Sequence, residues 1–245
     1  MRPSTQKNQL VLLAGLLCDN TVWKAVADCL AEKTHVQIFS FAGFASIEAM
    51  AAHVLEQAPD SFALAGHSMG GRVALELYRQ APARVERLAL LNTGVHPRTE
   101  AEVPGRQKLL ELAASQGMEA VADAWLPPMM SSKGLRDAAL MEQLRAMVLR
   151  HSVEDFQGEI QALLNRPDAT KVLPDIRVPT LLLSGSEDNW SPVSRHKDMQ
   201  AQIPHCSLVS LEGVGHMSTV EAPESIAHAF RQWLDNEQNT SCIGK

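Results

Sequence analysis

Residues 66–71, with the sequence Gly-His-Ser-Met-Gly-Gly, constrain the fold of this chain more than any other stretch. They follow an apolar strand pattern at residues 62–65 and precede a helical pattern at residues 73–78. Glycines around a serine at such a junction let the strand and helix backbones approach closely, and the sharp turn presents the Ser68 hydroxyl to a pocket. The same short motif also occurs by chance as a simple tight turn, so its context decides between the two interpretations.

Apolar runs alternate with helical patterns along most of the chain. The expected strands cover residues 10–14, 36–41, 62–65, 85–91, 180–183 and 207–211. Strict alternation of this kind is typical of an α/β fold, a mostly parallel sheet with helices on both faces and right-handed crossovers. We therefore predict about six strands, with ligands bound at their carboxyl ends.

The strand pattern is interrupted between Gly94 and Val178. Helical patterns fill this interval, among them one at residues 106–116 that ends at Gly117. Another begins at Ser152, where Asp155 stands three residues later as in a capping box. We predict a helical cap, residues 94–178, inserted after the fourth strand into a core domain made of residues 1–93 and 179–245.

Composition excludes several classes of function. The 245 residues carry a net charge of −6, which offers no basic field for nucleic acid or for an anionic membrane surface. The polar N-terminus lacks the apolar core of a signal peptide, and no apolar run approaches the ~20 residues of a membrane span. The four cysteines lack C-x-x-C spacing, which argues against a zinc site and a disulfide scaffold. We expect a cytoplasmic protein with no nucleic-acid or membrane partner.

Two residues after later strands supply what Ser68 lacks. Serine is a weak nucleophile and needs a base, and that base needs an orienting carboxylate. Asp188 lies in a turn after the fifth strand and His216 in a glycine-rich loop after the sixth, so both reach the edge of the sheet that holds Ser68. Taken alone, Asp188 is more typical of a turn than of a catalytic acid. The joint arrangement, however, predicts Ser68 as nucleophile, His216 as base and Asp188 as acid. His67 is expected to point away from the hydroxyl.

The oxyanion of a tetrahedral intermediate needs backbone donors. We expect the N–H of Met69, which follows the nucleophile, and the N–H of Leu16 in the loop after the first strand. Leu17, Trp125 and Met217 are predicted to line an apolar substrate pocket; the alternative is that such residues only pack the cap on the core. Cys18 is interpreted as a small buried hydrophobe. Motifs for a zinc protease, a P-loop and a dinucleotide site are absent from the sequence.

Four motifs resemble the α/β-hydrolase superfamily along essentially the full chain, in particular esterases and lactonases with a short helical cap. They are residues 12–15, residues 66–71, the G-x-x-D-x-x-x-P run from Gly185 to Pro192, and Gly215-His216-Met217 followed by Glu221 and Pro223. The order of serine, acid and histidine also matches that superfamily. The resemblance implies the α/β-hydrolase fold, the roles given above for Ser68, Asp188 and His216, and no metal or organic cofactor.

The resemblance also implies a substrate class, a small and largely apolar ester or lactone cleaved through an acyl-enzyme. Two alternatives stay open: a thioesterase or carbon–carbon bond hydrolase of the same fold, and a binding protein that turns over too slowly to matter. The serine nucleophile speaks against a haloalkane dehalogenase. The sequence departs from many relatives in two ways: Ala14 replaces a histidine before the oxyanion loop, and the two leading antiparallel strands of larger members are expected to be absent. Asn92 follows the fourth strand, where some relatives have their acid.

Overall fold

The structure is a computed structural model that describes residues 7–235. The predicted start and end of the core domain, residues 1 and 245, lie outside this range. The strands are β1 (Asn8–Leu13), β2 (Thr34–Phe39), β3 (Phe62–His67), β4 (Val85–Leu91), β5 (Thr180–Gly185) and β6 (Cys206–Leu211). The α-helices are α1 (Thr21–Leu30), α2 (Ile47–Gln57), α3 (Met69–Gln80), α4 (Val103–Trp125), α5 (Ala138–Val148), α6 (Val153–Leu164), α7 (Val193–Gln200), α8 (Ser218–Glu221) and α9 (Pro223–Asp235). Short helical turns are η1 (Pro82–Arg84), η2 (Glu100–Glu102), η3 (Pro127–Met129), η4 (Gly134–Arg136) and η5 (Thr170–Asp175).

The strands form one sheet in the order β2-β1-β3-β4-β5-β6, and each neighbouring pair is parallel. This confirms the predicted parallel sheet. β3 and β5 are buried along their whole length, whereas the edge strands β2 and β6 are partly exposed. Strands covered on both faces read as continuous apolar runs, which is why the central strands were legible in the sequence. The second strand begins at Thr34, two residues before the predicted start.

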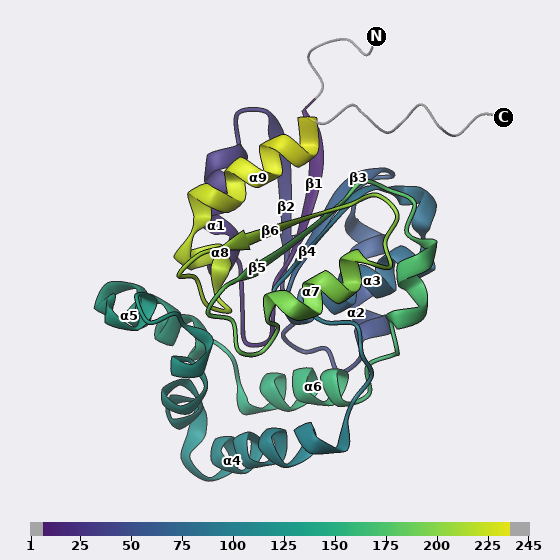
Figure 1. The fold of residues 1–245 in the computed structure, drawn as a ribbon. Coiled ribbons are helices and arrows are strands. Elements are labelled where there is room, and N and C mark those ends of the chain that lie inside the picture. The colour runs from purple at the N-terminus through teal and green to yellow at the C-terminus, as the bar shows by residue number, and fades with distance from the viewer. Residues whose placement is uncertain (1–6, 236–245) are drawn as a thin grey trace, which may run out of the picture.

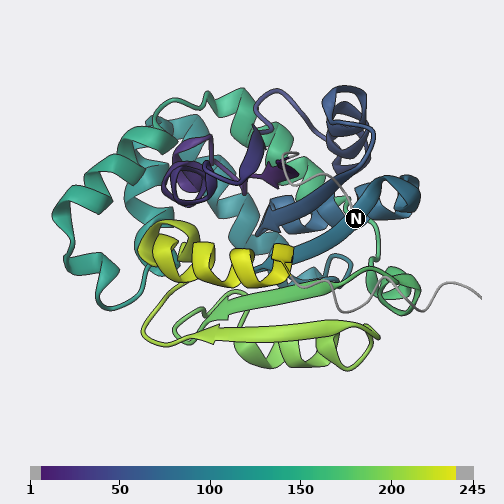
Figure 2. The same ribbon diagram turned by 90° about the horizontal axis from the view of Figure 1, so that it is seen from above.

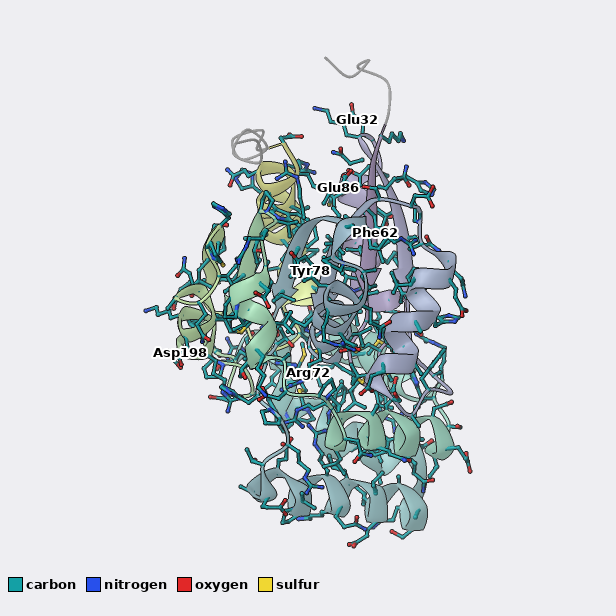
Figure 3. All side chains as sticks on the ribbon, turned by 90° about the vertical axis from the view of Figure 1, so that its right-hand side faces the viewer. Glu32, Phe62, Arg72, Tyr78, Glu86 and Asp198 are labelled. Carbon is teal, nitrogen blue, oxygen red and sulfur yellow. The ribbon has the colours of Figure 1, made fainter. Side chains whose placement is uncertain are left out.

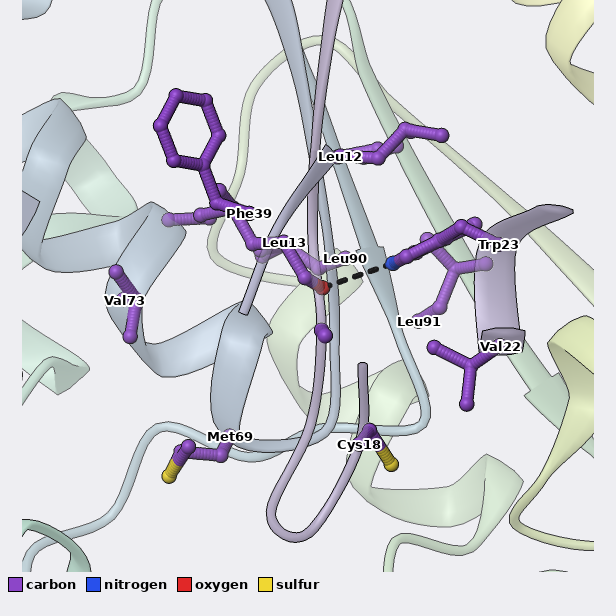
Figure 4. Packing of buried hydrophobic residues seen from close by; sticks show 14 of the residues in the cluster. Leu12, Leu13, Cys18, Val22, Trp23, Phe39, Met69, Val73, Leu90 and Leu91 are labelled. Carbon is purple, nitrogen blue, oxygen red and sulfur yellow. Dashed lines mark hydrogen bonds between the residues drawn. The ribbon is translucent and has the colours of Figure 1, made fainter. Parts of the chain in front are cut away.

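Helices cover both faces of the sheet (Figures 1 and 2). α1 and α9 pack together on one face, whereas α2 packs with α3 and α7 lies against β5 and β6 on the other. α1 buries Trp23, whose indole N–H donates to the Leu13 carbonyl at 3.0 Å, at the carboxyl end of β1 (Figure 4). The first helix is thus fixed to the point where the chain leaves the sheet for the active-site loop.

Residues 94–178, the predicted cap, contain α4, α5 and α6, which lie below the sheet in Figure 1. α6 begins with the predicted capping box of Ser152 and Asp155. Gly117 has a φ of 80° and breaks the helical conformation as predicted, but helical turns resume beyond it, so α4 continues through a kink to Trp125. Phe156 and Ile160 of α6 belong to the same apolar cluster as the sheet, which joins this segment to the core. Within the described range, no helix combines the length and the apolar composition needed to cross a bilayer.

Candidate active site

Ser68 occupies the turn between β3 and α3 with φ 54° and ψ −114°, a left-handed conformation that serine rarely adopts. The glycines around it are required by close packing. A Cβ on Gly66 would lie 2.2 Å from the Gly70 carbonyl oxygen, and one on Gly70 would lie 2.3 Å from the Leu13 carbonyl oxygen. The motif therefore holds a strained serine where β1, β3 and α3 meet.

The three residues predicted to act together lie in one hydrogen-bonded chain. The Ser68 Oγ is 2.8 Å from Nε2 of His216, and Nδ1 of His216 is 3.0 Å from Oδ2 of Asp188. Asp188 follows β5 and His216 follows β6, so adjacent parallel strands deliver both groups to the same edge. Both side chains are buried. In this arrangement, the imidazole can take the serine proton while the carboxylate holds its Nδ1–H.

Asp188 is held by more than His216. Its carboxylate accepts hydrogen bonds from the main-chain N–H groups of Trp190 and Ser191 and from Nδ2 of Asn92 at 2.8 Å. Burial opposes ionisation, yet His216 and these donors together hold the pKa of Asp188 well below its usual range. In the sequence, Asn92 is distinguished only by its place after β4. The structure gives it a contact with the acid, at a φ of 48° that asparagine tolerates better than most residues.

His67 is a second residue whose contact the sequence did not disclose. Its Nε2–H donates to the main-chain carbonyl of His216 at 2.8 Å, so this ring braces the loop that carries the base. Its Nδ1 has no hydrogen-bond partner among the described residues. Burial and the neighbouring His216 lower the pKa of His67 to about 4, which keeps its imidazole neutral near pH 7.

Leu16 and Met69 are the two residues whose main-chain N–H groups are predicted to bind an oxyanion. Both residues line the cavity at Ser68. Within the described residues, neither N–H donates to another group. The next N–H, that of Leu17, instead donates to Oε2 of Glu159 at 2.8 Å, and Leu17 has a φ of 55°. Glu159 was not identified from the sequence, because it lies far away in α6.

A cavity of about 500 Å³ opens at Ser68 and His216. Its walls include Trp125, as predicted, together with Leu109 and Ile160 from α4 and α6. Leu17 and Met217, also predicted to line the pocket, do not: they are 0% and 1% exposed and are packed in the core. A second hollow of about 490 Å³ lies between β5, β6 and α9 and contains none of the three catalytic candidates.

Comparison with known proteins places the chain in a family. Residues 10–229 match the model of the alpha/beta hydrolase family. The chain belongs to the alpha/beta hydrolase family. Among similar proteins, the pimeloyl-[acyl-carrier protein] methyl ester esterase of Aliivibrio salmonicida is 25% identical, over 94% of this chain and 93% of its own. The protein of that name from Aromatoleum aromaticum is 28% identical, over 89% and 94%.

Solved structures agree on the fold. A thermophilic esterase from Thermogutta terrifontis, solved with malate bound, superposes with a TM-score of 0.84 at 28% identity, covering 94% of this chain and 90% of the other. The enol-lactonase of Burkholderia xenovorans LB400 reaches the same TM-score of 0.84 at 23% identity, with 94% and 92% covered. Because its sequence identity to this chain is only 23%, the enol-lactonase supports the shared fold and nothing more.

The cavity of this alpha/beta hydrolase differs from the apolar pocket predicted from the sequence, because basic side chains form part of its wall. They are Arg72, Arg106, Arg166 and Arg195. Glu102 is the carboxylate that lines the same cavity, and it accepts from Arg106 and Arg166. Within residues 7–235, no three His, Cys, Asp or Glu side chains are arranged to hold a metal ion.

Proposed function

We propose that this chain is a serine hydrolase that cleaves a carboxylic ester or lactone through an acyl-enzyme. The observation that carries the proposal is the hydrogen-bonded chain from Ser68 through His216 to Asp188, which ends in a cavity of about 500 Å³. A serine whose only role was to form a tight turn would need neither a base at 2.8 Å nor free N–H groups beside it.

In the first half-reaction, Nε2 of His216 takes the Ser68 proton as Oγ attacks the ester carbonyl carbon. The main-chain N–H groups of Leu16 and Met69 donate to the oxyanion, and the N-terminus of α3 adds a favourable dipole. The tetrahedral intermediate then collapses, the bond to the alcohol oxygen breaks, and His216 gives its proton to that oxygen. The acyl group remains on Ser68.

In the second half-reaction, water enters where the alcohol left. His216 removes a proton from this water as its oxygen attacks the acyl carbon, and a second oxyanion forms at the same two donors. Collapse returns the proton to the Ser68 oxygen and releases the carboxylic acid. Asp188 holds the imidazole tautomer throughout, with Asn92 and two main-chain donors holding Asp188. The names of the curated relatives, methyl ester esterases, support ester chemistry over the alternatives.

A serine-directed fluorophosphonate probe, followed by rate measurements on aryl esters, lactones, thioesters and β-diketones, tests the proposal. We expect stoichiometric labelling of the wild-type enzyme, no labelling of Ser68→Ala, and turnover highest for esters or lactones. Folded wild-type protein that is not labelled would contradict the proposal, as would labelling without turnover of any substrate. A Ser68-dependent preference for thioesters or diketones would replace the ester with that bond.

A further inference from the structure

The active-site cavity is basic, although the chain as a whole has a net charge of −6. Four guanidinium groups line it, against the one carboxylate of Glu102 among the lining residues, an excess of 4 − 1 = 3 positive charges. The other carboxylate of the site, Asp188, is held by His216 and Asn92. Arginine remains protonated in proteins, so this charge is present throughout the neutral pH range.

Two of the four arginines form hydrogen bonds with a carboxylate of the protein. Arg166 is buried and donates to both carboxylate oxygens of Glu102, with distances of 2.6 and 3.1 Å, and to three main-chain carbonyls. Arg106 donates to the same carboxylate at 3.1 Å. Glu102 therefore neutralises part of the charge of Arg106 and Arg166, and both of its carboxylate oxygens already accept hydrogen bonds from this pair.

Arg72, by contrast, makes few hydrogen bonds within the described part of the protein. It stands one helical turn after Ser68, between the core and the helices α4 and α6 (Figure 3). Within the described residues, its one hydrogen bond is from Nη1 to the His96 carbonyl at 2.9 Å, and no carboxylate pairs with it. Burial and the positive charges of Arg166 and its neighbours lower the pKa of Arg72 to about 9, which still leaves it charged at pH 7.

A partly buried guanidinium with most of its donors unused is costly unless an anion accepts them. Arg195, an exposed residue of the cavity wall, also has no carboxylate partner within the described range and donates to the Trp190 carbonyl at 3.1 Å. The fork of a guanidinium fits the two oxygens of a carboxylate. Leu109 and Trp125 also line the cavity, and such apolar side chains suit a methylene chain between a carboxylate and the reacting carbonyl.

We propose that the substrate carries an ionised carboxylate in addition to the ester that Ser68 attacks, and that Arg72 binds this carboxylate with help from Arg195. This inference rests on the proposed function. The substrate class is a half-ester of a dicarboxylic acid, or a lactone with a carboxylate on its ring or side chain. It replaces the largely apolar substrate expected from the sequence with one that is apolar only in its middle.

The test compares monomethyl esters of dicarboxylic acids, from succinate to suberate, with the dimethyl esters of the same acids. We expect wild-type kcat/KM to favour the best half-ester over its neutral diester. In Arg72→Gln, kcat/KM for the half-ester should fall about 10- to 100-fold, the usual worth of a hydrogen bond to a charged group, whereas the diester should change less than about threefold. Arg72→Lys should keep part of the preference. Arg145→Gln, which changes a partly exposed arginine of α5 outside the cavity, is the matched control.

Binding without turnover separates this inference from the proposed function. Titration calorimetry on Ser68→Ala should detect the dicarboxylate anion of the preferred chain length, and the double variant Ser68→Ala/Arg72→Gln should bind it at least tenfold more weakly. A wild-type enzyme that hydrolyses diesters as well as half-esters would overturn the inference, and so would an equal loss on both substrates in Arg72→Gln. If Ser68 hydrolyses no ester at all while the anion still binds through Arg72, the proposed function fails and the anion site stands.

Discussion

At the scale of single residues, Asn92 shows how the acid of the site is held. Its Nδ2 donates to Asp188 at 2.8 Å and to the Gly215 carbonyl at 3.3 Å, so one side chain links the acid to the loop that carries the base. The hydroxyl of Ser218 donates to Oδ1 of Asn92 and fixes the amide from the other side. A buried carboxylate that loses a donor keeps its desolvation cost without the compensating hydrogen bond.

Replacing Asn92 should therefore lower activity more than it disturbs the fold. We expect Asn92→Ala to reduce kcat on an aryl ester by about tenfold or more, because Asp188 loses one charge-assisted hydrogen bond. Asn92→Gly is the matched control: it also removes the amide, but glycine accepts the φ of 48° without strain. Equal losses in both variants, with thermal unfolding measured in parallel, would assign the effect to the amide. Full activity in Asn92→Gly would refute the role.

At the scale of elements, α6 holds the loop that follows β1. Glu159 reaches from α6 to the Leu17 N–H, while its other oxygen, Oε1, has no partner among the described residues. Burial, reinforced by the nearby charge of Asp155 and opposed by the Leu17 hydrogen bond, raises the pKa of Glu159 from its ordinary value of 4.5 to about 8. The folded protein therefore holds a proton on this carboxyl group that the unfolded chain releases above pH 4.5.

The free energy of unfolding should consequently contain a contribution that falls as pH rises from about 4.5 to about 8, by about 1 kcal/mol per pH unit. Glu159→Gln removes this contribution and can still accept from Leu17. Its stability relative to wild type should therefore improve steadily between pH 5 and pH 8, as measured by urea unfolding. Glu154→Gln, an exposed position in the same helix, should follow wild type. Parallel curves for wild type and Glu159→Gln would contradict the shifted pKa.

At the scale of the whole molecule, Arg166 links the segment after α6 to the segment before α4. It follows α6 and donates to carbonyls at His96 and Pro97, where the chain leaves the core, and to Glu102 just before α4. One buried guanidinium thus holds together the segment before α4 and the segment after α6. The apolar cluster that runs from the sheet into α6 supplies the rest of the attachment.

Arg166→Met should lower the free energy of unfolding by about 3 kcal/mol, because removing one partner of a buried pair leaves the others unsatisfied. Since the cavity wall itself loosens, kcat/KM should fall for half-esters and neutral diesters alike, in contrast to Arg72→Gln. Arg98→Met removes an exposed pair with Glu100 in the segment before α4 and should cost less than about 1 kcal/mol. If the free energy of unfolding of Arg166→Met lies within about 1 kcal/mol of wild type, the segments before α4 and after α6 do not need this guanidinium to stay attached to each other.

Much of the fold could be predicted from the sequence because its signals are local. The alternation of apolar runs with helical patterns predicted the parallel sheet, and the glycines at residues 66–71 predicted the sharp turn at Ser68, which the structure has. Strand limits differ from the predicted ones by up to two residues, both in the edge strand β2, which starts at Thr34, and in the interior strands β1 and β5, which start at Asn8 and end at Gly185 respectively. The predicted helix ends at Gly117, whereas α4 continues to Trp125, because the helical turns on both sides of the kink bury apolar residues.

The sequence by itself determined which residues follow the strands, and hence that Ser68, Asp188 and His216 meet at one edge of the sheet. Only the tertiary structure decided what surrounds them. Glu159 contacts Leu17 across 142 residues of chain, and Asn92 contacts Asp188 across 96. The four arginines come from separate segments and carry no shared pattern that a sequence could display. Parallel strands bring their ends together by a general rule, whereas the placement of a cap side chain depends on packing that no local pattern encodes.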